Sequence, residues 1–558
     1  ITQCDPILFG LVFERFLNSE RIAYPDIDFD ISQKYRHIGI AYIADTYGED
    51  HVAQIITYGT LSKYMVIHDV LQAANISNSV INEVKSTIPD DPMVDLSDYK
   101  DDPKFLNAMQ SIPFPDSDVT VTRENAQRML DIGKLSVENR QIVMEVAMGI
   151  KPSATIHIKT SWTWQKALNI MLRLEGLNKN ESTHAAGVVV APVVLEENVP
   201  LMKKGGDGTL ACQYDMRSLE ALGYLKMDAL GLRTVDVNYD ASVLVRKWYD
   251  PNYDFAKLRY DDKEAIKIIN DGDTIGLFQI EGTGFTQMMQ HLDIGGFEVQ
   301  RYADRDESKL STIEKLRGEE IRDFMWISAG LALYRPGPLD AIIEGKTMVQ
   351  HLYDRKAGRE PIAYLFPEEK RYLEETYGVL VYQEQVMQIV RDLAGYTLGR
   401  SDLVRRAMSK KKAKDVERER EAFLHGDAAR NIKGCVANGI PEATAQAIYD
   451  EIYDFANYAF NKAHAVSYAV VAYQTAYFKC HYTKEYMAAL LTSVLDNSDK
   501  VSEYIAECRN CDIKLLPPDV NRSHDGFTVE EDGIRFGLVA IKNIGRGFIR
   551  ALVRERES

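Results

Sequence analysis

Polar and hydrophobic residues alternate strictly over residues 24–31, where an aspartate stands at every second position from Asp26 onward. Successive side chains of a β-strand point to opposite faces, so the pattern predicts a strand with Asp26, Asp28 and Asp30 on one face. Adjacent carboxylates repel one another unless water, basic groups or a hard cation such as Mg²⁺ offsets the repulsion. The stretch is therefore a solvated edge strand or one wall of a metal site. A calcium loop of the EF-hand kind is excluded, because its sixth position needs Gly and Ile31 stands there.

A second alternating stretch, residues 223–233, predicts a strand with Lys226 and Asp228 on one face. The apolar run over residues 183–192 predicts a buried strand before it. If the strand with Lys226 and Asp228 lay beside the first one, its acid and its lysine would complete a two-metal site with a cationic neighbour. An isolated Lys-x-Asp pair is more often a surface ion pair.

Helical spacing of apolar residues covers most of the remaining chain. It predicts a helix over residues 35–47 that ends at Gly48, and a helix capped near Thr60. Residues 75–180 are predicted to form a helical packing or clamping lobe with acidic, proline-broken loops, and residues from 236 to about 490 are predicted to be mostly helical. A charged segment over about residues 299–322 is interpreted as a solvated surface insertion.

The composition of the 558 residues is that of a soluble globular protein with several domains. No apolar run is long enough to span a bilayer and no signal peptide opens the chain, so we expect a cytoplasmic protein without a membrane partner. The chain opens at Ile1 within an apparent element, which indicates a piece of a longer protein. The six cysteines are scattered, and the pair Cys508 and Cys511 lacks the second pair of a zinc site, so reduced thiols are expected.

The formal net charge of -17 is unusual for a protein that binds nucleic acid. The distribution of charge changes this picture. Acidic residues concentrate in residues 90–118, whereas residues 405–414 are strongly basic. A locally positive groove can therefore coexist with an acidic protein.

Three stretches are suited to phosphate or nucleotide contact. Residues 395–412 predict a cationic helix that begins at Ser401, with a solvated basic face as the alternative. Residues 458–468 combine Asn461 and His464 with aromatic side chains, although a structural core histidine is the commoner use of such a residue. Gly545 and Gly547 form a turn before a predicted helix whose N–H groups can face a DNA phosphate. The cations of the first stretch are Arg405, Arg406, Lys410, Lys411 and Lys412.

Taken together, these motifs resemble those of the bacterial replicative DNA polymerase III alpha subunits, the family C DNA polymerases. Their order and spacing agree over nearly the whole chain. The motifs include Asp-Ile-Asp-Phe-Asp at residues 26–30, Lys-Met-Asp at 226–228, Arg-Pro-Gly-Pro at 335–338, Gln-Glu-Gln-Val-Met at 383–387, Gly-Tyr-Thr-Leu-Gly at 395–399 and Phe-Asn-Lys-Ala-His at 460–464.

The resemblance implies an α/β palm of the polymerase β-like nucleotidyltransferase type with a mostly helical thumb and fingers. It implies a first palm part with the catalytic strand at residues 1–57, a thumb at 58–182, a second palm part at 183–234 and fingers at 235–490. Residues 491–558 would hold the end of the fingers and the start of a helix-hairpin-helix region. The implied activity is DNA-templated addition of deoxynucleotides to a primer 3′ end in chromosomal replication, by two-metal phosphoryl transfer.

The resemblance also implies roles for single residues. Asp26, Asp28 and Asp228 would be the catalytic carboxylates that bind two Mg²⁺ ions, with Asp30 in support. The residues implied to bind the nucleotide are Lys226, Arg405, Arg406, Tyr458, Asn461 and His464, the last as a sugar gate. Those implied to bind DNA are Lys410, Lys411, Lys412, Gly545 and Gly547. The implied partners are primer-template DNA and deoxynucleoside triphosphates, with the sliding clamp and other replisome subunits bound through regions not in this chain.

Two alternatives stay open. The same carboxylates could serve a metal-dependent phosphodiesterase, although Lys226 and the helix with Arg405 favour a triphosphate substrate. The Gly-Ser element that precedes the first acidic strand in the family is not in this chain. The second alternative is therefore an inactive or incomplete DNA-binding fragment.

Overall fold

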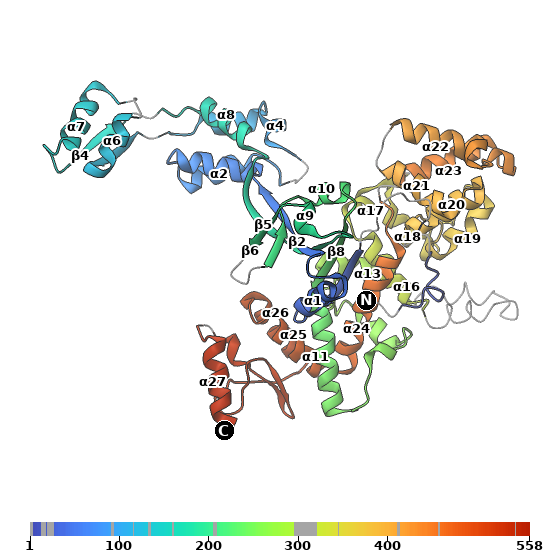
Figure 1. The fold of residues 1–558 in the computed structure, drawn as a ribbon. Coiled ribbons are helices and arrows are strands. Elements are labelled where there is room, and N and C mark those ends of the chain that lie inside the picture. The colour runs from blue at the N-terminus through green and yellow to red at the C-terminus, as the bar shows by residue number, and fades with distance from the viewer. Residues whose placement is uncertain are drawn as a thin grey trace. The chain divides into compact units, whose positions relative to one another are not determined.

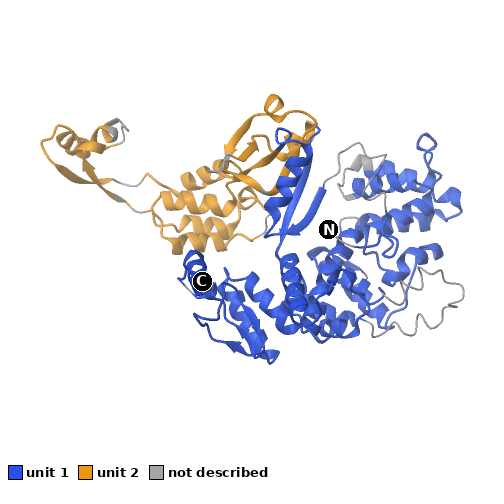
Figure 2. Ribbon diagram, turned by 60° about the horizontal axis from the view of Figure 1, so that its bottom comes forward, with its two compact units in different colours: residues 1–52, 223–558 blue, residues 53–222 orange. Residues whose placement is uncertain are grey.

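The contacts within the chain divide it into two compact units (Figure 2). Unit 1 comprises residues 1–52 and 223–558, and unit 2 comprises residues 53–222. The two acidic strands thus belong to the same unit, although the whole of unit 2 separates them in sequence. The computed structural model describes residues 4–12, 18, 27–90, 94–114, 116–131, 135–158, 161–204, 209–294, 321–343, 345–409, 413–455, 458–541 and 543–557.

The acidic strands of unit 1 are β1 (Ile27–Ser32) and β8 (Leu225–Leu232), which pair in parallel and lie side by side in Figure 1. Parallel neighbours need a long connection, and here unit 2 supplies it. Helix α1 (Arg36–Tyr47) follows β1, and α11 (Arg233–Trp248) follows β8 without a loop. A Cβ atom added to Gly39 of α1 would lie 3.0 Å from Cδ1 of Ile31. Helix α1 therefore packs closely against the apolar face of β1.

The rest of unit 1 is mostly helical. Its helices within the described residues are α12 (Lys263–Asp271), α13 (Thr283–Leu292), α16 (Phe324–Leu333), α17 (Pro336–Asp340), α18 (Met348–Lys356), α19 (Lys370–Leu373), α20 (Gln383–Ala394), α21 (Leu398–Ser409), α22 (Ala413–His425), α23 (Glu442–Phe455), α24 (Lys462–His481), α25 (Thr483–Ser493), α26 (Ser498–Asn510) and α27 (Arg546–Glu557). Two small sheets complete it, with the strand orders β10-β9 and β11-β13-β12. Their strands are β9 (Ile342–Ile343), β10 (Lys346–Thr347), β11 (Leu515–Leu516), β12 (Thr528–Glu530) and β13 (Gly533–Arg535).

Helix α24 lies at the centre of this helical part, in contact with α11, α12, α16 and α25. Twelve of its 20 residues are buried, and they occur on every side of the helix. A helix that is apolar all round belongs in a core rather than at a surface. Small buried residues such as Ala465, Ala469 and Ala472 let the neighbouring helices approach. The position of α24 is therefore set by several helices at once.

Unit 2 contains a sheet segment and two groups of helices. Its sheet strands run in the order β5-β2-β7-β6, with β2 parallel to β7 and β6 antiparallel to β7. Two further strands, β3 and β4, form a two-stranded antiparallel sheet that packs on α6 and α7, the helices between them in the chain. The strands are β2 (Val52–Thr60), β3 (Ser117–Thr122), β4 (Ser153–Ile158), β5 (Asn178–Val190), β6 (Leu201–Lys204) and β7 (Thr209–Cys212). The helices are α2 (Lys63–Ala73), α3 (Asn78–Ser86), α4 (Leu96–Tyr99), α5 (Pro103–Gln110), α6 (Arg123–Asp131), α7 (Val137–Ala147), α8 (Trp164–Leu174), α9 (Leu195–Asn198) and α10 (Met216–Ala221).

These elements confirm a mixed α/β protein with more than one compact part. The three predicted strands correspond to β1, β5 and β8, and the helix predicted over residues 35–47 corresponds to α1. The helix predicted to begin at Ser401 starts earlier, at Leu398, because the Thr397 hydroxyl accepts a hydrogen bond from the Arg400 N–H and so caps it there. The helix predicted to be capped near Thr60 starts at Lys63, since β2 continues through Thr60.

The prediction of a helical lobe over residues 75–180 omitted the two-stranded sheet of β3 and β4. The residues of β3 alternate between valine and threonine, with Val121 fully buried and Thr122 exposed. Such a run of β-branched residues has the period of a strand. Residues 299–320 of the segment interpreted as an insertion lie outside the described residues.

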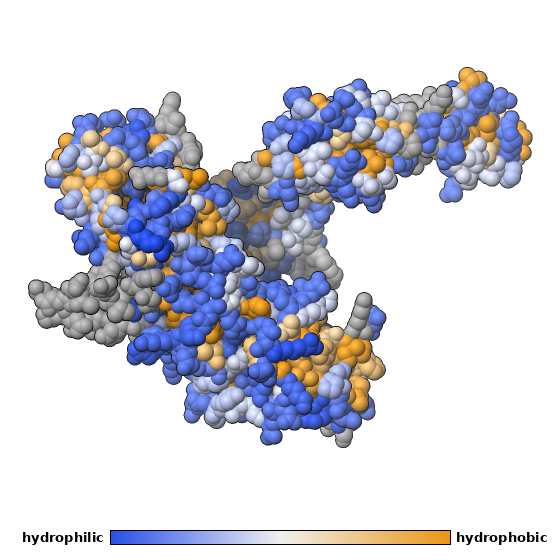
Figure 3. Space-filling model, turned by 180° about the vertical axis from the view of Figure 1, so that it is seen from behind, coloured by the Kyte–Doolittle hydropathy of each residue, from blue (hydrophilic) through white to orange (hydrophobic). Residues whose placement is uncertain are grey.

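Within the part of the chain that the structure describes, no helix combines the length and hydrophobicity needed to cross a membrane. On the face drawn in Figure 3, hydrophobic residues occur in separate groups among hydrophilic ones.

Candidate active site

The pairing of β1 with β8 brings the two acidic stretches together. Asp28 lies directly opposite Asp228 in the parallel register, and Asp30 lies opposite Leu230. Opposed residues on neighbouring strands point to the same face, and the strands are about 4.8 Å apart. Asp30 shares this face with Asp28 because it lies two residues further along the strand. Three carboxylates therefore line one side of the strand pair.

Asp228 is the buried member of this group, with 7% of its surface exposed. Its Oδ2 atom lies 2.7 Å from Nζ of Lys226, which points to the same face. Its Oδ1 atom is buried and has no hydrogen-bond partner among the described residues. A buried polar atom without a partner costs about 1–3 kcal/mol. The strand pair thus presents a carboxylate oxygen that a cation would satisfy.

Helix α24 contributes Tyr468 to the same place. Its hydroxyl is hydrogen-bonded to Asp30, and Asp28 also acts on it. Burial, followed by these carboxylates, raises the pKa of Tyr468 to about 12. The phenol therefore stays protonated and acts as a donor to Asp30 at any physiological pH. The prediction from the sequence did not include Tyr468 among the site residues.

His464 lies one helical turn before Tyr468, and the centroids of the two rings are 4.3 Å apart. Burial lowers the pKa of His464, and Asp30 opposes this effect only in part. Part of the ring nevertheless remains exposed. A neutral imidazole is thus held within the electrostatic reach of the acidic strand.

The two other residues predicted around the nucleotide lie at the start of α24. Asn461 is the N-cap of the helix, and its side chain accepts a hydrogen bond from the His464 N–H at 3.2 Å. The carbonyl of Tyr458 accepts a hydrogen bond from the Arg335 guanidinium, which also lies 4.5 Å from the ring centroid of Phe460. A Cβ atom on Gly337 would lie 2.2 Å from the Tyr458 ring, so this position requires glycine. The Arg-Pro-Gly-Pro turn therefore holds the start of α24.

Arg405 and Arg406 share one acidic partner on their own helix, α21. Asp402 is almost completely buried, and its Oδ1 accepts hydrogen bonds from the Arg405 guanidinium at 2.9 and 3.2 Å. Its Oδ2 accepts one from Nε of Arg406 at 2.9 Å. The Arg405 side chain is 7% exposed and that of Arg406 is 32% exposed. Arg406 is thus the more accessible of the two to a ligand.

The remaining predicted residues are separate from this group or are not described. Asp26 and Lys410 to Lys412 lie outside the described residues. Gly545 precedes α27 and Gly547 is its second residue. A Cβ atom on either glycine would meet no other atom within 4 Å, so the space next to both is open. The turn before α27 is therefore accessible to a large ligand such as DNA.

Comparisons with known proteins match this arrangement to one family along most of the chain. The model of the bacterial DNA polymerase III alpha NTPase domain matches residues 1–134 and 125–231. The model of the bacterial DNA polymerase III alpha subunit finger domain matches residues 236–298 and 309–431, and a helix-hairpin-helix motif matches residues 512–558. The first match contains both acidic strands, and the second contains α21 with Arg405 and Arg406.

Curated relatives give the same answer over the whole chain. The DNA polymerase III subunit alpha of Thermus aquaticus is 39% identical over 562 residues, covering 100% of this chain and 39% of the relative. That of Aquifex aeolicus (strain VF5) is 36% identical over 558 residues and that of Bacillus subtilis (strain 168) is 35% identical over 557 residues, each covering 100% of this chain and 42% of the relative. The chain belongs to the family of bacterial DNA polymerase III alpha subunits. It spans about two fifths of the length of these relatives.

Two residues that contact the predicted site residues were missed in the sequence analysis. Tyr468 lies four residues after His464, and Asp402 lies three and four residues before the two arginines. Residues three or four apart share one face of a helix, so both could have been found from spacing alone. The contact between Tyr468 and Asp30 could not, because the two residues lie on elements from opposite ends of the chain.

Proposed function

We propose that this chain is the catalytic core of a DNA-templated DNA polymerase that adds deoxynucleotides to a primer 3′ end. In this proposal β1 and β8 belong to a palm of the polymerase β-like nucleotidyltransferase type. Residues 58–182 act as thumb and residues 235–490 as fingers, with DNA and deoxynucleoside triphosphates as the partners. Membership of the alpha-subunit family supports the proposal.

The observation that carries the proposal is the register of Asp28 with Asp228. Two carboxylates on adjacent strands, with Asp30 on the same face, form an oxygen-rich wall of the kind that hard divalent cations prefer. Lys226 is the basic residue on these two strands, and it forms an ion pair with Asp228. The surplus negative charge and the unsatisfied Oδ1 of Asp228 therefore fit a divalent cation.

Asp28 and Asp228, together with Asp26, would hold two Mg²⁺ ions. When bound, these ions lower the pKa of an attacking hydroxyl and stabilise charge on a transferred phosphate. The protein's own part is positioning. Lys226 would turn from Asp228 toward the phosphates, and the Arg405 and Arg406 guanidinium groups would grip the triphosphate in bidentate fashion.

Helix α24 would shape the pocket for the sugar and base. His464 is neutral and stands beside the ring of Tyr468, so it would act as a steric gate rather than as a charge. Asn461 would hold His464 in place through the helix cap, and Tyr458 would lie near the base. Together these side chains would determine which nucleotides fit the pocket.

The DNA itself would be held by Lys410 to Lys412 and by the backbone N–H groups around Gly545 and Gly547. Such contacts are made to phosphates, so DNA affinity should fall steeply as the salt concentration rises. Fluorescence anisotropy of a labelled primer-template at increasing NaCl checks this point. An affinity that does not change with salt would contradict it.

Single-nucleotide incorporation on a primed template with Mg²⁺ tests the function. The parent chain is compared with Asp28→Ala and with a control, Asp45→Ala, at an exposed position of α1. We expect incorporation by the parent and the control, and none by Asp28→Ala, with primer-template affinity equal in all three. Near-normal incorporation by Asp28→Ala would exclude a metal role for this residue. No incorporation by any of them, with DNA bound, would favour the inactive DNA-binding alternative.

A further inference from the structure

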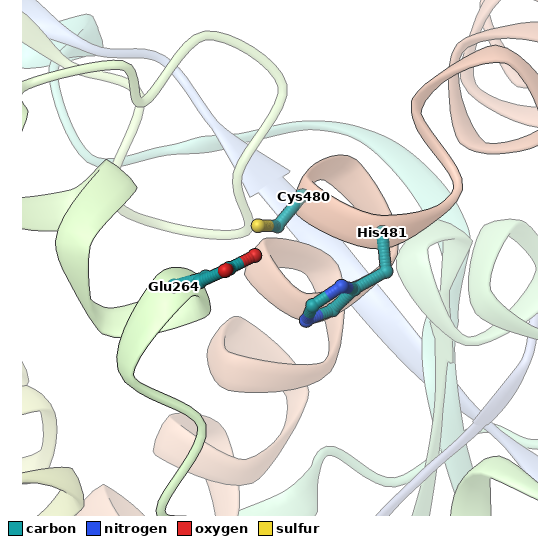
Figure 4. Close-up of side chains that lie close together, drawn as sticks. All are labelled: Glu264, Cys480 and His481. Atoms are coloured by element: carbon teal, nitrogen blue, oxygen red, sulfur yellow. The ribbon is translucent and has the colours of Figure 1, made fainter.

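A second cluster of metal-binding side chains lies away from the acidic strands, where α12 begins and α24 ends. A carboxylate oxygen of Glu264, Sγ of Cys480 and a ring nitrogen of His481 all lie within 4.8 Å of one another. Figure 4 shows the sulfur atom facing the carboxylate, with the imidazole beside them. Helices α12 and α24 pack against each other, so the cluster rests on two firmly placed elements.

Asp262 supports this cluster from the N-cap position of α12. Its Oδ2 atom lies 2.9 Å from Nε2 of His481, while its Oδ1 accepts a hydrogen bond from the Ala265 N–H at 2.8 Å. Histidine ligands of metals commonly have their second ring nitrogen bonded to such a carboxylate, which fixes the orientation of the ring. The partner that this arrangement needs is therefore already present.

The electrostatic environment of Cys480 favours a cation. Burial raises the pKa of its thiol first, and Asp262, Glu264 and Asp273 raise it further. Lys267 acts in the opposite direction, but its ammonium group is paired with Asp271 at 2.5 Å. A divalent cation placed among these donor atoms would offset the acidic charge around the sulfur and bind the sulfur as a thiolate.

We propose that Glu264, Cys480 and His481 bind a divalent cation of the Zn²⁺ class, with Asp262 orienting His481. A set of sulfur, nitrogen and oxygen donors suits Zn²⁺ far better than Mg²⁺, which prefers oxygen alone. Tetrahedral coordination places ligand atoms about 3.3–3.8 Å apart, given Zn–ligand distances of about 2.0–2.3 Å. Small rotations of the exposed Glu264 and His481 side chains would close the present separation. On binding, the thiol releases its proton to water as the metal–sulfur bond forms.

The consequence would be a cross-link between two helices. The metal would tie the start of α12 to the last turn of α24, the helix whose N-cap is Asn461 and whose first half carries His464 and Tyr468. A ligand that binds only the folded state raises the unfolding temperature. The site would therefore stabilise the helix that lies against the acidic strands, whatever reaction the chain performs.

Co²⁺ titration of the metal-free chain tests the proposal, because thiolate–Co²⁺ bonds give a charge-transfer absorption that oxygen ligands do not. Co²⁺ bound by Asp28 and Asp228 would thus not produce this signal. We expect the band to appear with one equivalent of Co²⁺, to be displaced by Zn²⁺, and to be accompanied by a higher unfolding temperature. Absence of the band in the folded chain would overturn the proposal.

Variants assign the signal to the cluster. The band should be lost in Cys480→Ser and retained in Cys511→Ser, a cysteine at the C-cap of α26. Asp262→Asn keeps an N-cap residue of equal quality. It should keep the fold and weaken Zn²⁺ binding roughly 10–100-fold. A band that survives Cys480→Ser, or Zn²⁺ affinity unchanged in both Asp262→Asn and Glu264→Gln, would show that the metal binds elsewhere.

Discussion

Charged side chains are paired in different ways on the strand pair β1–β8 and on helix α21. The two strands carry three aspartates, Asp28, Asp30 and Asp228, and one lysine, which pairs with Asp228, and one oxygen of Asp228 has no partner among the described residues. On α21, the two arginines close upon the carboxylate of Asp402, which lies within one turn of both. Aspartates therefore outnumber basic residues on the two strands. On the helix both arginines are paired with Asp402, and under the proposed function a triphosphate would compete with Asp402 for them.

The comparison explains why both regions are compatible with a folded protein in the absence of ligands. Arg405 is buried and would be costly without Asp402. Folding costs less for the strand carboxylates, because Asp28 is exposed to water and Asp30 accepts a hydrogen bond from the Tyr468 hydroxyl. The charges of the strand pair and of α21 are thus balanced in different ways, and the proposed substrate would contact both regions.

The strongest test of the contrast is Asp228→Asn, which keeps the shape of the side chain but removes the charge. Nucleotide incorporation should fall by about 10³-fold or more, the scale of groups that stabilise a transferred phosphoryl. Binding of primed DNA should be unchanged. Pre-steady-state incorporation at saturating nucleotide is the measurement, with Asp45→Asn as the exposed control. A loss of less than tenfold would mean that the strand charge is not needed for the chemistry.

Removal of one arginine of α21 should have a smaller effect on nucleotide incorporation. Arg406→Ala is the variant of choice, because this side chain is partly exposed and its loss leaves Arg405 paired with Asp402. The KM for the nucleotide should rise about 10- to 100-fold, as expected for hydrogen bonds to a charged group worth roughly 1.5–3 kcal/mol. DNA affinity should change little. Arg371→Ala, at an exposed position in the same unit, is the control.

Equal losses of nucleotide and DNA binding in Arg406→Ala would contradict the assignment of α21 to the triphosphate. A companion variant, Asp402→Asn, sharpens the point. The substitution weakens the carboxylate that competes with the triphosphate for the arginines. The KM for the nucleotide should therefore fall if the chain remains folded.

The contact between helix α24 and strand β1 is tested by Tyr468→Phe. The ring remains against His464, while the hydrogen bond to Asp30 is lost. Incorporation should fall about 10-fold, the lower end of the range for a hydrogen bond to a charged group, roughly 1.5–3 kcal/mol. Discrimination against ribonucleotides should fall with it, because His464 loses a fixed neighbour. Unchanged discrimination in Tyr468→Phe would show that the hydroxyl does not position the gate.

The smallest effect concerns Glu451, an acid on helix α23. Burial, followed by Glu369, raises the pKa of Glu451 to about 7. An unfolded glutamate titrates near 4.5, so the folded state binds more protons between these values. Stability from this group is complete below the lower value and is lost as the pH rises toward 7. Glu451→Gln should therefore raise the unfolding temperature by a few degrees at pH 8 and not at pH 4.5. Equal shifts at both pH values would contradict this account.

Local patterns were a good guide to single elements. The alternation around Asp28 and around Asp228 predicted both strands and the face on which each acid stands, and helical spacing predicted α1 and the mostly helical character of residues from 236 to about 490. The two-stranded sheet of β3 and β4 was missed although the valine and threonine alternation of β3 was visible, because the acidic, proline-broken surroundings suggested only loops and helices. Starts of helices shifted by a few residues where a cap such as Thr397 had been overlooked.

The sequence by itself determined which side chains share a face, since the periods of strands and helices depend only on local geometry. It therefore placed Lys226 with Asp228 and the arginines together on α21. Only the tertiary structure decided that Asp28 stands opposite Asp228 and that Tyr468 reaches Asp30. Those contacts join residues hundreds of positions apart. Their register is set by the packing of α1, α11 and the helices around α24, which no local pattern contains.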